Sequence, residues 1–182
     1  MSGINDFERS IRAAQNALAE IPKGAEAAAA RAFNRALMAG RTAAVKEITS
    51  RYTVKAKDVR STFKMRKATK THLEAELVSE GTALPLRAFA HKPTTDTTGR
   101  KRKPIRVTIK GSNQFELTTS FIWKKHIFTR LGNTRLPVKK ATGPSVPSML
   151  GNENIVEEVQ GVMEETAAKR MEHEMERLAG GK

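Results

Sequence analysis

The spacing of apolar residues changes twice along this chain, and that change limits the possible folds more than any other feature. Spacings of three and four residues predict helices at residues 4–18, 24–50 and 152–178. Spacings of two predict four to six short strands within residues 51–150, most clearly at residues 105–109. Short turns between consecutive strands favour antiparallel pairing. The sequence therefore predicts an α+β fold with two N-terminal helices, an antiparallel β-sheet of four to six strands and a long C-terminal helix.

Length and composition predict one domain with a thin core. All 182 residues fit a single domain with a helical part (1–50), a basic β-rich part (51–150) and an acidic C-terminal helix (151–182). Hydrophobic residues make up only 38% of the chain and aromatic residues only 5%. A core with so few large side chains favours a subunit that gains stability from its partners, with a self-sufficient monomer as the alternative.

Charge is distributed unevenly along the chain. The net charge of +14 comes mainly from residues 51–150, which carry 22 bases and six acids, whereas residues 151–182 carry four bases and eight acids. Such a basic middle can neutralise the phosphates of a nucleic acid. It can equally bind an acidic protein surface, including the acidic tail of a neighbouring copy. The charges alone leave both kinds of partner open.

Residue types disfavour several classes of site. Without cysteine, the chain can form neither disulfides nor thiolate metal sites. The first residues mix charged with apolar side chains, and no apolar run reaches the length of a membrane span. We therefore expect no membrane partner and a product that stays in a cytoplasm or is packed into something built there. The histidines are scattered, and the glutamate pairs at 157–158 and 164–165 lie on the charged side of a helix. We therefore expect no metal, no cofactor and no enzymatic activity, with an uncharacterised hydrolase as the weakest alternative.

Residues 128–150 form a basic segment without any acid, and a Gly-Pro-Ser-Val-Pro turn occupies residues 143–147. The prolines restrict the backbone of this turn, and the segment has no side chain suited to acid–base chemistry. A rigid basic segment of this kind predicts a contact surface, as does the apolar face of the second helix. The predicted subunit contacts are Phe33, Leu37, Phe128, Arg130, Arg135, Pro137, Gly143, Pro144 and Pro147.

Two further clusters of bases are candidates for contact with nucleic acid or with an acidic partner. They comprise Arg100, Lys101, Arg102, Lys103, Lys124 and Lys125. The single tryptophan and the single tyrosine, Trp123 and Tyr52, do not predict a platform for stacking bases. Any nucleic-acid contact should then be directed at the backbone and insensitive to base sequence. A sequence-nonspecific, basic nucleic-acid-binding protein is therefore the alternative function.

Three features together resemble the prophage minor tail protein Z family. The first is the Ala-rich helix with Phe-Asn-Arg-Ala at residues 33–36, and the second is the strand block leading from Val107 and Ile109 to Phe121. The third and most specific feature joins Phe-Thr-Arg, Arg-Leu-Pro-Val and Gly-Pro-Ser-Val-Pro-Ser-Met-Leu within residues 128–150, ahead of a terminal helix rich in Glu and Arg. The resemblance covers essentially the whole chain.

The resemblance implies a structural virion protein of a long-tailed phage or prophage. Such a minor tail protein would act in tail completion, late in tail assembly and near the head-proximal end. Its implied partners are other tail or neck proteins and further copies of itself, with a ring as one arrangement and a backbone contact with genomic DNA as another expectation. It would reside in the virion tail after assembly in the bacterial host cytoplasm, and no catalytic residue is implied.

Overall fold

The computed structural model describes residues 24–95, 104–151 and 153–179, which form two compact units. We call them the helical unit and the sheet unit. The helical unit comprises residues up to Ala43, Lys64–Val78 and the chain from Val156 onward. The sheet unit comprises Ala44–Phe63 and Ser79–Ile155. Each unit is therefore built from segments that are separated in the sequence.

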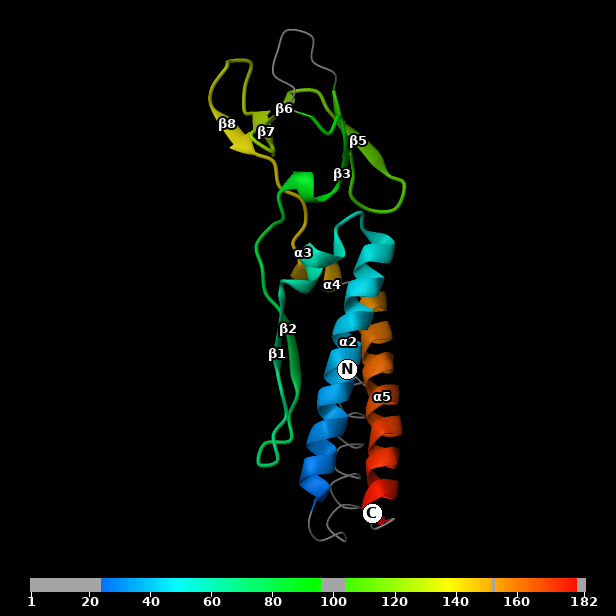
Figure 1. Ribbon diagram of the computed structural model, residues 1–182. Helices are drawn as coiled ribbons and strands as arrows, with labels where there is room; N and C mark the ends of the chain where they lie inside the picture. The colour runs from blue at the N-terminus through cyan, green and yellow to red at the C-terminus, as the bar shows by residue number, and fades with distance from the viewer. Residues whose placement is uncertain (1–23, 96–103, 152, 180–182) are drawn as a thin grey trace. The chain divides into compact units, whose positions relative to one another are not determined.

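Two long antiparallel helices dominate the helical unit (Figure 1). They are α2 (Ala25–Arg51) and α5 (Glu153–Ala179). The C-terminal end of α2, from Ala44, and the N-terminal end of α5, up to Ile155, belong to the sheet unit. The buried side of α2 consists largely of alanines between Ala25 and Ala36, which are good helix formers and allow a neighbouring helix to approach closely. At Gly40 the absence of a side chain makes room for Met163 of α5, because a Cβ atom there would clash with Met163 Cγ and lie 2.5 Å from Met163 Sδ.

A two-stranded antiparallel sheet adds to the helical unit. Its strands are β1 (Phe63–Arg66) and β2 (Glu76–Ser79), each of which has one residue, Phe63 or Ser79, in the sheet unit. Asn34 on α2 holds the connection between the strands, because its side chain donates to the carbonyl of Ala68 and accepts from the N–H of Ala68, both at 2.9 Å. One amide thus satisfies both backbone groups of a buried loop residue.

The sheet unit contains two three-stranded antiparallel sheets. One consists of β3 (Ala90–Lys92), β4 (Ile105–Thr108) and β5 (Gln114–Leu117), and the other of β6 (Ser120–Trp123), β7 (His126–Arg130) and β8 (Val138–Lys140). The short helices are α3 (Ala56–Arg60), the 3-10 turn η1 (Leu86–Ala88) and α4 (Val146–Leu150). Alternate residues of the strands fill the core, and Ile105, Val107, Ile122 and Ile127 are almost completely buried.

The α+β class, the helix predicted at 24–50 and the long C-terminal helix are confirmed. The prediction of one sheet with four to six strands is wrong, because the described residues contain eight strands in three small sheets. Strands of three to five residues offer few ladder bonds, and alternation reveals a strand without revealing its partner. The helix predicted at 4–18 and the bases Arg100, Lys101, Arg102 and Lys103 lie outside the described residues.

Candidate functional site

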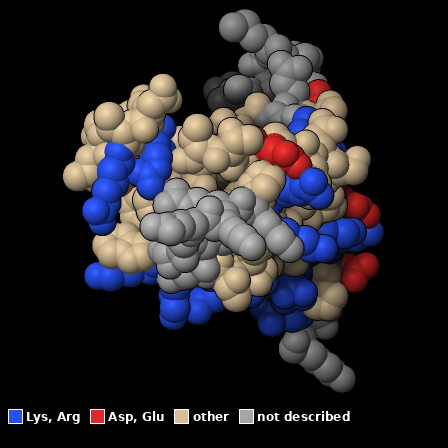
Figure 2. Space-filling view, turned by 90° about the horizontal axis from the view of Figure 1, so that it is seen from above, with Lys and Arg blue, Asp and Glu red and all other residues tan. Residues whose placement is uncertain are grey.

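The β6–β7–β8 sheet belongs to a stretch of the chain that carries bases and no acid. No acidic residue occurs between Glu116 and Glu153, whereas this interval contains six bases: Lys124, Lys125, Arg130, Arg135, Lys139 and Lys140. On the left of Figure 2, blue side chains lie among tan ones and no red one appears. The sheet therefore presents a field that favours an anionic partner.

Strand register brings the aromatic residues of this sheet together on one face. Phe121 is directly opposite Phe128, Trp123 is opposite His126, and Phe128 is opposite Lys140, so these side chains project from the same side. The ring centroids of Phe121, Trp123 and His126 lie 5.8, 6.0 and 6.3 Å from that of Phe128. The opposite side is the core side, where Ile122 and Ile127 are buried.

We call this surface the aromatic–basic face, comprising Phe121, Trp123, His126, Phe128, Arg130 and Lys140. Cations cover its rings: Lys124 Nζ lies 4.7 Å from the Trp123 ring centroid, and Arg130 Cζ lies 5.1 Å from that of Phe121. Lys140 Nζ lies 3.5 Å from His126 Nε2. Trp123 nevertheless remains 46% exposed. The face therefore combines large ring surfaces with positive charges on long side chains. This combination suits a partner that is anionic and also has flat apolar surfaces.

The turn that joins β6 to β7 is conformationally unusual. Its two residues, Lys124 and Lys125, both have positive φ angles, of 45° and 61°. Two-residue hairpin turns of this geometry strongly prefer Asn-Gly, because a side chain at positive φ costs roughly 1 kcal/mol or more. The chain thus holds two lysines at the edge of the aromatic–basic face at a conformational cost.

A second exposed feature is the loop between β7 and β8, residues 131–137, which we call the hairpin tip. Leu131 and Leu136 are 63% and 68% exposed there. Arg130 Nη1 donates to the carbonyl of Arg135 at 2.5 Å, and the Leu131 N–H donates to the carbonyl of Pro137 at 3.2 Å, so the loop is closed by its own hydrogen bonds. Two exposed leucines beside Arg135 are typical of a protein–protein contact.

The Gly-Pro-Ser-Val-Pro turn, by contrast, packs inside the sheet unit. A Cβ atom on Gly143 would lie 2.6 Å from Phe89 Cε2, so only glycine fits beside this ring. The Gly143 N–H donates to the Leu84 carbonyl at 2.8 Å, and the Pro144 carbonyl accepts from the Leu84 N–H at 3.4 Å. Ser145 caps α4 by accepting from the Ser148 N–H. Gly143 and Pro144 therefore hold the turn against Leu84 within the sheet unit, and Pro147 lies in the first turn of α4.

One side of α5, in the helical unit, presents charge of the opposite sign. Six glutamates of α5 are exposed and recur at spacings of seven, eight and four residues, which places them along one side of the helix. We call this side the acidic ridge: Glu157, Glu158, Glu164, Glu165, Glu172 and Glu176. A hydrogen bond from Lys169, 2.5 Å away, and the charge of that lysine lower the pKa of Glu165, so it stays ionised.

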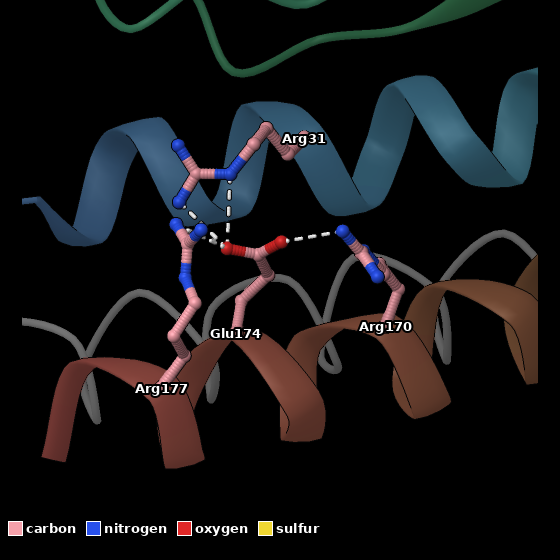
Figure 3. A network of polar contacts seen from close by, with 4 residues as sticks. All are labelled: Arg31, Arg170, Glu174 and Arg177. Carbon is pink, nitrogen blue, oxygen red and sulfur yellow. Dashed lines mark hydrogen bonds and ion pairs between the residues drawn. The ribbon is translucent and has the colours of Figure 1, made fainter. Parts of the chain in front are cut away.

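A different glutamate, Glu174, lies on the buried side of α5 within a cluster of arginines (Figure 3). Its Oε2 accepts hydrogen bonds from Arg31 Nε at 2.9 Å and Arg31 Nη2 at 2.6 Å, and it lies 3.1 Å from Arg177 Nη2. Its Oε1 lies 2.8 Å from Arg170 Nη2, an ion pair without hydrogen-bond geometry. This cluster links α2 to α5 and is a structural feature of the helical unit.

Phe33 and Leu37, the predicted contacts on α2, also lie in the helical unit. Leu37 is fully buried, whereas Phe33 is half-buried and lines a cavity of about 70 Å³ together with Leu73 and Met163. A cavity of this size is far smaller than the roughly 300 Å³ or more of a typical small-molecule site. The contact role of Phe33 and Leu37 stays a prediction.

Sequence reasoning missed the aromatic–basic face. The aromatic candidates from the sequence were Trp123 and Tyr52. In the structure Trp123 contacts the ring of Phe128 and lies opposite His126, whereas Tyr52 forms an isolated bridge with Lys110. The signal was an alternating Phe-x-Trp and His-x-Phe on either side of a two-residue turn. The structure brings Lys124, Lys125, Phe128 and Arg130 to this region and leaves Arg135 and Pro137 at the hairpin tip.

Within the ranges that the structure describes, no three His, Cys, Asp or Glu side chains group as metal ligands would. In the same ranges, no helix is long and apolar enough to span a bilayer.

A family model described as prophage minor tail protein Z (GPZ) matches residues 9–178 of the 182-residue chain. No curated protein and no solved structure matches the chain.

Proposed function

We propose that this chain, which belongs to the prophage minor tail protein Z family, completes the tail late in assembly at its head-proximal end. Family membership makes it a structural protein of the virion tail whose partners are other tail proteins. We propose further that the protein is assembled into the tail in the host cytoplasm and that it has no enzymatic activity. Segregation of opposite charges onto two separate surfaces supports the proposed role in tail completion.

The two surfaces are complementary in charge and in chemical character. The hairpin tip carries Arg135 between two exposed leucines and is followed by Lys139 and Lys140 on β8, without an acid nearby in the sequence. The acidic ridge extends over residues 157–176, roughly 30 Å of helix, with exposed Val162 and the aliphatic stems of glutamates beside it. We assign the hairpin tip of one copy to the acidic ridge of the next.

A contact of this kind is heterologous, because each copy uses one surface to bind the other surface of its neighbour. Heterologous contacts close into rings when the rotation between copies is a simple fraction of a turn. A ring of such subunits suits the end of a tubular tail, where neck proteins dock. Burial of the exposed leucines then supplies affinity at the contact, and the charges supply orientation and rate.

Charge reversal on each surface tests this contact. Arg135→Glu with Leu136→Ser reverses the charge of the hairpin tip and removes the more exposed of its two leucines. We expect the full-length protein to lose association in sedimentation experiments and to fail in tail complementation. Lys57→Glu is the matched control, because it reverses an exposed base of the same unit outside the tip. The control should assemble like the wild type.

Mixing complementary variants makes the test specific. Arg135→Glu alone and the ridge variant Glu164→Lys with Glu172→Lys should each associate poorly, whereas their mixture should associate again, since each reversed surface meets a reversed partner. A wild-type protein that stays monomeric with or without other tail proteins, or variants that enter tails normally, would overturn the proposal.

A further inference from the structure

The proposed subunit contact uses the hairpin tip and the acidic ridge, so the rings of the aromatic–basic face are left to bind another partner. We propose that it binds single-stranded nucleic acid, stacking bases on Trp123 and the adjoining rings while the surrounding lysines and Arg130 neutralise phosphates. This site goes beyond the proposed role in tail completion and does not depend on it. It also revises the expectation that any nucleic-acid contact would involve the backbone alone.

The arrangement of rings and charges fits this ligand. The ring centroids of Phe121, Trp123 and His126 lie 5.8 to 6.3 Å from that of Phe128, and the four rings lie on the adjacent strands β6 and β7, about 5 Å apart, which is room for one or two unstacked bases. Every base has a π-face, so such a surface accepts bases of any sequence. The absence of acids from residues 117–152 removes any repulsion of phosphates by this part of the chain.

The cations that now lie over the rings do not block binding. A cation–π contact at an exposed site contributes about 0.5–1 kcal/mol, whereas stacking of a base on an aromatic side chain contributes about 1–3 kcal/mol. Lys124 is long enough to leave Trp123 and to contact a phosphate instead, whereas Arg130 stays bonded to the Arg135 carbonyl and can meet a phosphate with its remaining N–H groups. The exchange therefore favours the nucleic acid, because the ring gains a base and the cation gains an anion.

The lysines of the β6–β7 turn provide independent support. Asn-Gly would form this turn with less strain, yet both positions at positive φ hold lysine. Strain of this kind is found where a side chain serves a purpose other than stability. Two charges at the edge of the ring surface are placed to contact successive phosphates of a strand whose bases lie on the rings.

A duplex and an acidic protein surface are the rival ligands. The bases of a duplex are stacked on one another and cannot lie flat on the sheet, so a duplex would engage only the cations. An acidic peptide would likewise engage the cations and leave the rings without a flat partner. The ring surface therefore favours a single strand, and the rivals become outcomes of the test.

The test uses the full-length protein, in which Trp123 is the only tryptophan, so its fluorescence reports on this face alone. A short oligothymidylate should quench the fluorescence to saturation, with log affinity falling linearly with log salt at a slope of about −0.7 per phosphate contact. A matched duplex and poly-L-glutamate should bind more weakly and quench less.

Two variants separate binding from folding. Trp123→Ala should lower the affinity for a dye-labelled oligothymidylate at least about fivefold in anisotropy measurements. Lys124→Asn with Lys125→Gly should lower the affinity and reduce the magnitude of the salt slope by about 1.4, while raising the melting temperature, because the new residues suit the turn. An unstable protein cannot produce that combination.

The control is Lys55→Asn with Lys57→Gln, which removes the same charge from exposed positions in and next to α3 and should leave the affinity within about twofold. The proposal is overturned if oligothymidylate fails to quench Trp123, if poly-L-glutamate or the duplex binds as tightly, or if Trp123→Ala binds as the wild type does.

Discussion

Replacing Glu174 by glutamine removes one charge from the contact between α2 and α5 and leaves the shape of the side chain nearly unchanged. In the wild type this buried carboxylate accepts two hydrogen bonds from Arg31 and lies within 3.1 Å of a guanidinium nitrogen of Arg177. Glutamine can accept at one oxygen, but its amide nitrogen would meet guanidinium groups that are also donors. The substitution therefore weakens the cluster without creating a large cavity.

The expected cost follows from the exposure of the arginines. Breaking a fully buried ion pair costs about 3–5 kcal/mol, because a charge is left buried without a partner. Here the side chains of Arg31, Arg170 and Arg177 are 42%, 41% and 52% exposed, so water can hydrate them after the substitution. We therefore expect Glu174→Gln to lower the free energy of unfolding by about 1–2 kcal/mol at neutral pH.

The effect should depend on pH in a defined direction. The hydrogen bond from Arg31 lowers the pKa of Glu174 below its ordinary value of 4.5, desolvation opposes this shift, and the charges of Arg31, Arg177 and Arg170 add to it. Because the folded-state pKa is the lower one, the carboxylate contributes its full stabilisation above pH 4.5 and loses it as pH falls through the folded-state pKa. The difference between wild type and Glu174→Gln should therefore shrink in acid.

The assay is denaturant unfolding of the full-length protein, followed by the helical circular dichroism signal at neutral and acidic pH. Glu172→Gln is the matched control, because it removes an exposed charge two residues away and should change the unfolding free energy by less than about 0.5 kcal/mol. The reasoning fails if Glu174→Gln is as stable as the wild type at neutral pH, or if its deficit is the same in acid.

Three further substitutions test the packing inside each unit. Gly143→Ala should cost about 1–3 kcal/mol in denaturant unfolding because its methyl group meets the Phe89 ring, and Phe89→Leu should relieve part of that cost in the double variant; additive effects would contradict this contact. Gly40→Ala should cost less, about 1 kcal/mol, because Met163 is flexible enough to move, and a crystal structure should show it displaced. Asn34→Ala should cost about 1–3 kcal/mol and increase amide exchange in the β1–β2 connection, whose backbone groups it leaves unsatisfied; unchanged exchange would refute this role.

Much of the local structure was readable from the sequence because it depends on local periodicity. Apolar spacing located α2, α5 and β4 close to their observed bounds, since each period matches the geometry of its own element. The strands β3 and β5 were missed, because Ala90–Lys92 and Gln114–Leu117 have three and four residues and mostly exposed side chains. Such segments become strands only through pairing with Ile105–Thr108.

Only some features of the candidate site could likewise be predicted from the sequence. The positive charge of residues 119–150 was visible from composition, and so was the acidity of the last helix. The meeting of Trp123 with Phe128 depends on cross-strand register, which a one-residue slip would reverse. Gly143 was expected at a contact with a partner, but its closest neighbour is the ring of Phe89, 54 positions earlier in the chain.

The sequence by itself determined the long helices α2 and α5 and the central strand β4, how charge is divided along the chain, and which family the chain resembles. Only the tertiary structure decided that the strands form three small sheets, that Glu174 is buried while the neighbouring glutamates form an exposed ridge, and that four rings share one face. The physical reason is that dihedral preference and periodicity act over a few residues. Contacts between distant segments depend instead on register and packing, which no single segment encodes.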